Sequence, residues 1–172
     1  GVDLRASSKR SSTVVALNDD SNVVFFDSFN RDPELHEMVD SHKPDLIAIG
    51  APLGLPGGLC CLETTCCCRF SNPQNKGRQS EIDLARMGIS CFFTNKGSII
   101  RNLIYRSIEL NKHLSQMGYR VIEVYPHATK VLLFGDKAPP KNSPKSVTFL
   151  KEKLTPLVPG LDSHLDGMDR NT

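Results

Sequence analysis

The sequence predicts an α/β domain in which a mixed sheet of five strands is flanked by helices. Two observations carry this prediction. Three short runs rich in β-branched and aromatic residues come first, joined by polar turns, which favours an antiparallel meander. Later, four consecutive apolar residues, Leu46–Ile49, end in a corner rich in glycine and proline. A continuous apolar run of this length is typical of a parallel strand covered on both faces.

Length and composition indicate one globular domain over residues 1–172, with 23% charged and 39% hydrophobic residues. The net charge is only +2, so any site for a polyanion must be local. No apolar stretch approaches the roughly 20 residues that cross a bilayer, and no basic-then-apolar leader is present, so we expect a cytoplasmic protein without membrane contact. Gly1 opens the chain inside an expected strand, and Thr172 closes it inside an expected helix. Both are consistent with natural ends outside this sequence.

The order of the expected elements defines the sheet. Strands are expected at Val2–Leu4, Thr13–Leu17, Val23–Phe29, Leu46–Ile49 and Tyr119–Tyr125. A helix from an Asp32 N-cap to His42 separates the third strand from the fourth. A crossover through a helix implies that the fourth strand runs parallel to an earlier one.

Further helices are expected in the second half of the chain. Ser80 is a candidate N-cap for a short helix that Gly88 ends. The longest helix is expected to begin at Thr94 and to stop at Gly118, because apolar residues between them form one stripe. Shorter helices are expected over 127–134, over 146–154 and around His164.

Chemistry is expected at the carboxyl end of the strand Leu46–Ile49. Open α/β sheets bind ligands in the crevice at this end of their parallel strands. The first strand, the Tyr119–Tyr125 strand and the last helix supply Asp3, Glu123, Asp166 and Asp169 to the same edge. Converging carboxylates are what two divalent ions require. Taken singly, each acid is also explained as a solvated or salt-bridged surface residue.

A known family is matched, in order along the chain, by the segments Gly1–Leu4, Ile49–Pro56, Gly118–Lys130 and Leu165–Asp169. They resemble a family of predicted nucleases with the ribonuclease H-like fold, which is catalogued as a domain of unknown function. The resemblance covers nearly the whole chain. It implies this fold, a Mg²⁺ or Mn²⁺ cofactor and hydrolysis of nucleic acid. It further implies catalytic roles for Asp3, Glu123, Asp166 and Asp169, with the first three as metal ligands.

One position departs from the family, whose central motif usually reads Asp-Ala-Pro-Leu-Gly. This chain has Gly50 in place of the aspartate. Two ions held about 3.5–4 Å apart need several anionic oxygens, so losing one carboxylate weakens at least one ion. Two alternatives stay open: a weakened metal-dependent nuclease, and a non-catalytic nucleic-acid or nucleotide binder of the same fold. Without the family, a positive φ before Pro52 explains the glycine.

Basic residues near the expected edge are candidates for binding phosphate. They are Arg5 and Lys9 on the first hairpin, Lys96 at the start of the long helix and Lys130 beyond Glu123. Each is also explained as a solvated surface charge. A phosphotransferase of the related actin-like fold is disfavoured, because residues 5–12 contain no glycine for a phosphate loop.

Residues 57–79 form a cysteine-rich insertion loop. It contains Cys60, Cys61, Cys66, Cys67 and Cys68, and Cys91 follows alone. Structural zinc sites prefer two separated pairs of the Cys-x2-Cys type, and adjacent cysteines are expected to point in different directions. The pattern therefore disfavours Zn²⁺ and iron–sulfur ligation. We expect free or disulfide-bonded thiols first, and a metal site second.

Overall fold

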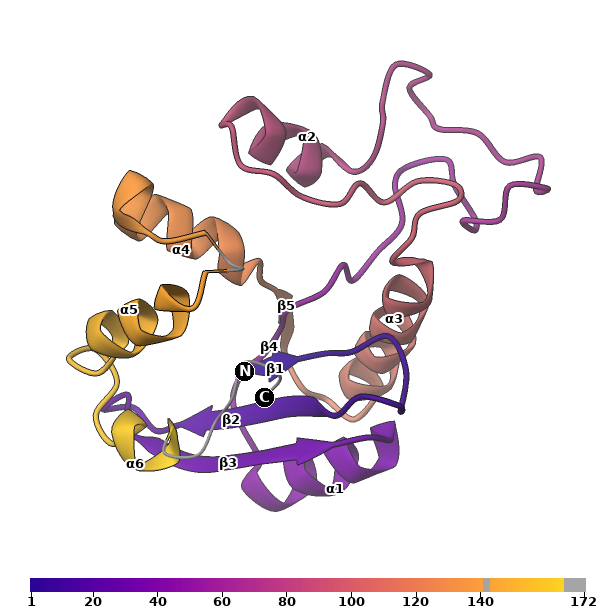
Figure 1. Ribbon diagram of the computed structural model, residues 1–172. Coiled ribbons are helices and arrows are strands. Elements are labelled where there is room, and N and C mark those ends of the chain that lie inside the picture. Colours follow the sequence, from indigo (N-terminus) through magenta and orange to yellow (C-terminus); the bar gives the residue numbers. More distant parts are fainter. Residues whose placement is uncertain (141–142, 166–172) are drawn as a thin grey trace.

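The chain folds around a five-stranded sheet with strand order β3-β2-β1-β4-β5 (Figure 1). The structure is a computed structural model and describes residues 1–140 and 143–165. The strands are β1 (Val2–Asp3), β2 (Ser12–Leu17), β3 (Val23–Phe29), β4 (Ile47–Ile49) and β5 (Val121–Glu123). β2 pairs antiparallel with both β1 and β3, whereas β4 runs parallel to both β1 and β5. The α/β class and the mixed sheet are therefore confirmed.

The helices fall into separate groups. They are α1 (Asp32–His42), α2 (Gln79–Arg86), α3 (Arg101–Gln116), α4 (Pro126–Phe134), the 3-10 turn η1 (Gly135–Lys137), α5 (Lys145–Leu154) and α6 (Leu161–Leu165). Figure 1 shows α4, α5 and α6 grouped away from α1 and α3, while α2 and its long flanking loop extend beyond the sheet. Of the helices in the described ranges, none combines the length and apolar character that crossing a bilayer requires.

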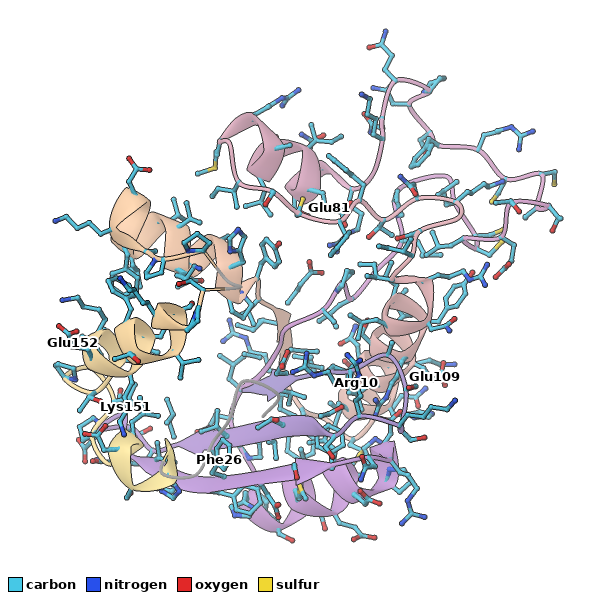
Figure 2. The ribbon with its side chains drawn as sticks, in the orientation of Figure 1. Arg10, Phe26, Glu81, Glu109, Lys151 and Glu152 are labelled. Atoms are coloured by element: carbon cyan, nitrogen blue, oxygen red, sulfur yellow. The ribbon has the colours of Figure 1, made fainter. Side chains whose placement is uncertain are left out.

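The main core lies between one face of the sheet and helices α1 and α3. Its buried members include Val2, Val14, Ile47 and Ile49 from the strands, with Leu35, Val39, Leu110 and Leu114 from the helices. Alternation along each strand sends successive residues to opposite faces. The ring of Phe25 packs at a tilt against His42 of α1 with centroids 4.2 Å apart, whereas the ring of Phe26, labelled in Figure 2, lies 6.2 Å from that of His164 of α6.

Arg106 of α3 fixes the turn that follows β1. Its Nε and Nη2 donate to Oδ1 of Asp32 at 2.8 and 2.5 Å, and its Nη1 donates to the backbone oxygen of Arg5 at 2.7 Å. The Arg106 side chain is only 12% exposed, so these bonds are well shielded from water. The position of Asp3 is consequently set by α1 and α3 as well as by the sheet.

The residues that cap two of the helices differ from the prediction. α1 and α2 are preceded by Arg31 and Arg78 in the N-cap position, where the sequence predicts Asp32 and Ser80. In both helices, a glutamate three positions after the arginine accepts hydrogen bonds from the arginine's backbone amide and its Nε. A carboxylate at this position satisfies a backbone donor and complements the helix dipole.

The predicted start of the longest helix is also wrong. α3 begins at Arg101 and not at Thr94. Thr94 is buried, and its backbone amide and Oγ1 donate to the Glu81 carboxylate at 2.7 and 2.6 Å. These bonds hold the chain around Thr94 against α2. Residues 95–100 therefore form turns, and α3 begins only after them.

Truncation of Leu114 tests the core. Leu114 is fully buried, so Leu114→Ala should lower the free energy of unfolding by about 2–5 kcal/mol, through lost burial and a residual cavity. Urea denaturation followed by circular dichroism measures this change. Met117→Ala is the control, because Met117 just beyond the same helix is 45% exposed and should lose much less. Equal losses would contradict the described packing.

Candidate functional site

The three parallel strands end side by side at one edge of the sheet. Ile49 of β4 pairs with Val2 of β1 on one side and with Glu123 of β5 on the other. Neighbouring strands lie about 4.8 Å apart, so the Cα atoms of Asp3 and Glu123 are separated by roughly 10 Å. Gly50 follows Ile49 and lies between them. This is the edge at which the sequence predicts a ligand crevice.

The strand register assigns the two acids to opposite faces. Residues paired in register on neighbouring parallel strands share a face. Glu123 therefore leaves the sheet on the face of Val2 and Ile49, which is the face of the main core. Asp3, one residue after Val2, leaves on the other face. The structure thus brings Asp3 and Glu123 to one edge but not to one face.

Gly50 has an ordinary backbone conformation. The hypothesis that it requires a positive φ is wrong, because its φ lies outside the left-handed region. A Cβ at Gly50 would lie 3.4 Å from the backbone oxygen of Val2 and 3.9 Å from the Pro126 ring, which are ordinary contact distances. By the same register, its side chain would share the face of Asp3. The position therefore has room for a side chain such as that of aspartate.

Asp3 is held only loosely. Its Oδ2 lies 3.1 Å from Nη2 of Arg5, and the two side chains are 57% and 38% exposed. Ion pairs this exposed contribute about 0–1 kcal/mol, because water and salt compete with both partners. Lys9 is exposed on the same turn. The Asp3 carboxylate can therefore exchange its arginine for another cation at little energetic cost.

Glu123, by contrast, is fully engaged. Nη1 and Nη2 of Arg78 donate to its two carboxylate oxygens at 2.5 and 2.7 Å, and the backbone amide of Leu53 donates to Oε2 at 2.9 Å. Two parallel bonds between guanidinium and carboxylate are among the strongest polar contacts in proteins. This interaction joins the end of β5 to the start of α2 and to the loop after β4.

Arg78 is held from its other side by Glu81, which is only 3% exposed (Figure 2). Glu81 accepts hydrogen bonds from the backbone amide and Nε of Arg78, at 3.0 and 2.8 Å, in addition to those from Thr94. Burial lowers the pKa of Arg78, but its hydrogen bonds to Glu123 and Glu81 outweigh this effect and raise the pKa above its usual value. Gly77 is required beside this pair, because a Cβ there would lie 2.4 Å from Oε2 of Glu81.

Sequence reasoning missed Arg78 and Glu81. A usable signal was present, since Arg-x-x-Glu precedes α1 as well as α2. The two copies differ in burial, because the side chains of Arg31 and Glu34 are 75% and 31% exposed, whereas those of the second pair are 15% and 4% exposed. Only tertiary packing distinguishes them.

The remaining predicted residues lie elsewhere. Nζ of Lys96 donates to the backbone oxygen of Cys66, and Nζ of Lys130 donates to that of Pro139 at 3.1 Å. Each lysine therefore has a partner of its own within another segment. Asp166 and Asp169, predicted on the last helix, lie outside the described residues.

Four of the six cysteines come together in the insertion loop. The Sγ atoms of Cys60, Cys61, Cys66 and Cys68 all lie within 4.8 Å of one another, and no disulfide links the cysteines. Cys60 and Cys61 are adjacent and both contribute, which corrects the expectation that neighbouring cysteines point apart. Hydrogen bonding to the Cys66 thiol raises the pKa of Cys60 to about 12. A hydrogen bond from the Cys60 backbone lowers the pKa of Cys68 to about 6.

Substitution of Glu81 tests whether the buried pair supports the site. In Glu81→Gln, Arg78 loses a charged partner inside the protein, and breaking a buried ion pair from one side typically lowers the free energy of unfolding by about 3–5 kcal/mol. Asp83→Asn is the matched control, because its pair with Arg86 on the same helix is largely exposed. Urea denaturation of both variants makes the comparison. A loss in Glu81→Gln no larger than that in Asp83→Asn would contradict this arrangement.

Comparison with known proteins assigns neither a family nor a function to this site. No protein-family model, curated protein or solved structure matches the chain. The resemblance to the ribonuclease H-like nuclease family therefore stays a prediction.

Proposed function

We propose that the chain is a metal-dependent nuclease of reduced competence, which hydrolyses phosphodiesters at the edge that carries Asp3. The observation that supports this most is the exposed, loosely paired carboxylate of Asp3 at the carboxyl end of the parallel strands, beside Gly50. Carboxylate oxygens are the ligands that Mg²⁺ and Mn²⁺ prefer. Such an ion would supply a bound water of lowered pKa as the nucleophile.

Within residues 1–140 and 143–165, the carboxylates available at this edge fit one ion better than two. On the Asp3 face, the family's second carboxylate is replaced by Gly50. Glu123 leaves the sheet on the opposite face, and its oxygens already accept from Arg78 and Leu53. Its role in this proposal is positional, because it anchors the loop after β4 and the start of α2. A weakened rather than a full activity follows from this reduced set of carboxylates.

A phosphate backbone is the substrate chemistry that the surrounding charges favour. Arg5 lies against Asp3, and Lys9 is exposed on the following turn. An arginine next to a metal-binding carboxylate is suited to contact a non-bridging phosphate oxygen as the ion displaces it from the pair. The proposed partner is therefore nucleic acid, bound by local charge rather than by a global basic field.

A second candidate function is a non-catalytic nucleic-acid or nucleotide binder. One specific observation favours it: the guanidinium of Arg78 occupies the Glu123 carboxylate with two short hydrogen bonds. An acid neutralised in this way is a structural element. Under this alternative, the same edge binds phosphate without cleaving it, and the binding weakens steeply with salt.

Cleavage assays on DNA and RNA with Mg²⁺ or Mn²⁺ separate the candidates. The wild-type chain should cleave slowly, and Asp3→Asn should lower the rate by roughly 100-fold, the scale on which one well-placed electrostatic group acts. Gly50→Asp should raise the rate by about tenfold or more, which corresponds to about 1.4 kcal/mol of the barrier. The Gly50 backbone admits this side chain, so the variant should fold.

Asp20→Asn is the control for Asp3→Asn, because Asp20 is an exposed acid in the turn between β2 and β3. Its rate should equal that of the wild type. Salt-sensitive binding without cleavage in every variant, Gly50→Asp included, would support the second candidate instead. Cleavage that survives Asp3→Asn unchanged would overturn the proposed site.

A further inference from the structure

The four clustered thiols have the spacing of a tetrahedral metal site. Zinc–sulfur bonds of about 2.3 Å in a tetrahedron place the sulfurs about 3.8 Å apart. Sγ of Cys60 and Sγ of Cys66 lie 3.6 Å apart, and every pair among the four is within 4.8 Å. A disulfide requires about 2.05 Å between its sulfurs. Within the described part of the chain, no other set of three or more histidine, cysteine or acidic side chains is grouped closely enough to share an ion.

We propose that Cys60, Cys61, Cys66 and Cys68 bind one Zn²⁺ as a structural site. Four thiolates in a tetrahedron select zinc over the hard cations proposed for the Asp3 edge, because soft sulfur ligands suit it. With all four positions filled by protein, the ion has no open position for a substrate. The proposal concerns a separate part of the chain and is independent of the proposed nuclease activity.

The backbone holds the ends of the loop together around the thiols. The amide of Ser71 donates to the oxygen of Gly57 at 2.8 Å, which closes the segment that contains all four cysteines. Gly58 has a φ of +88°, and a Cβ there would lie 2.4 Å from the Arg69 oxygen. Only glycine permits this close approach of the two chain segments. The closure confines the four thiols to a short segment of chain.

The loop is also fixed from inside by the first turns of α3. Leu62, which lies between the two groups of cysteines, is fully buried with Leu59 and Ile104. Its backbone amide donates to the Tyr105 hydroxyl at 2.7 Å, and its oxygen accepts from the amide of Gly97 at 3.1 Å. A metal site whose ligands lie on an anchored backbone loses less conformational entropy on binding.

Two cations, Arg69 and Lys96, contact the backbone of the cysteine loop, and neither forms an ion pair with a carboxylate of the described residues. Nη1 of Arg69 donates to the backbone oxygens of Cys67 and Cys68 at 2.9 and 3.0 Å, and Nζ of Lys96 donates to that of Cys66. Zinc with four thiolates carries a net charge of −2, and two nearby positive charges offset it. This accounts for Lys96, which the sequence assigns to phosphate binding, as part of the environment of the metal.

The loop supplies its own control. Cys67 lies between two proposed ligands but is exposed and does not belong to the cluster. A general affinity of cysteine-rich chain for metal would involve Cys67 as much as its neighbours. A specific site would not involve it.

The experiment titrates the reduced chain of 172 residues with Zn²⁺ and with Co²⁺ as a spectroscopic probe. We expect one equivalent of either metal to bind, with the visible bands and thiolate charge-transfer absorption of tetrahedral cobalt. Cys67→Ser should behave as the wild type. Cys66→Ser removes a direct ligand, so its affinity for the metal should fall by more than about 100-fold. Loss of a residue that only hydrogen-bonds to a ligand typically costs roughly 10–100-fold. Circular dichroism checks that both variants fold.

A second test uses the wild-type chain: its cysteine thiols are alkylated with and without zinc, and peptide mass spectrometry identifies which of them react. Bound zinc should protect Cys60, Cys61, Cys66 and Cys68 from alkylation and leave Cys67 reactive. Equal effects of Cys67→Ser and Cys66→Ser, absence of metal binding by the reduced chain, or purification with iron and no zinc would each overturn the proposal. Failure here leaves the Asp3 edge untouched, since the two sites share no residue.

Discussion

The ion-pair network of Arg78 with buried Glu81 and partly exposed Glu123 is the constraint on which the rest of the site depends. One guanidinium joins a helix start, a strand end and, through Glu123, the amide of Leu53 in the loop after β4. Burying Glu81 and most of Arg78 is favourable only because each donor and acceptor has a partner, and a partly satisfied network would be worse than an apolar one. The long insertion therefore leaves the sheet and returns to it at fixed points.

Strand register determines what the carboxyl edge can do. Glu123 pairs with Ile49 and shares the core face, where a charge needs a buried partner, and Arg78 provides one. Asp3, one residue out of phase, leaves on the other face and keeps only an exposed ion pair with Arg5. One acid is consequently structural, and the other is available to a ligand. This division follows from the period of two along a strand.

In the insertion loop too, some residues fix the backbone while others are available to bind a ligand. Glycines at 58 and 77 permit close approaches that any side chain would block, one at the base of the cysteine loop and one beside Glu81. Between these points, Leu62 is buried against α3, and Cys68, one of the four clustered cysteines, packs against the same apolar group. A small apolar cluster next to grouped thiols is typical of a loop that a metal ion completes.

The sequence by itself determined the class of the fold, the five strands and the mixed, antiparallel and parallel, character of the sheet, because apolar periodicity and short connections report local structure directly. It also identified Asp3 and Glu123 as residues of one sheet edge. Tertiary structure alone decided their faces, the partners of Glu81 and Thr94, the late start of α3 and the convergence of Cys60 with Cys66. The faces of the acids, the partners of Glu81 and the start of α3 depend on contacts between separate elements, and the cysteine cluster depends on an irregular loop. Neither kind of contact leaves a periodic signal in the residues that make it.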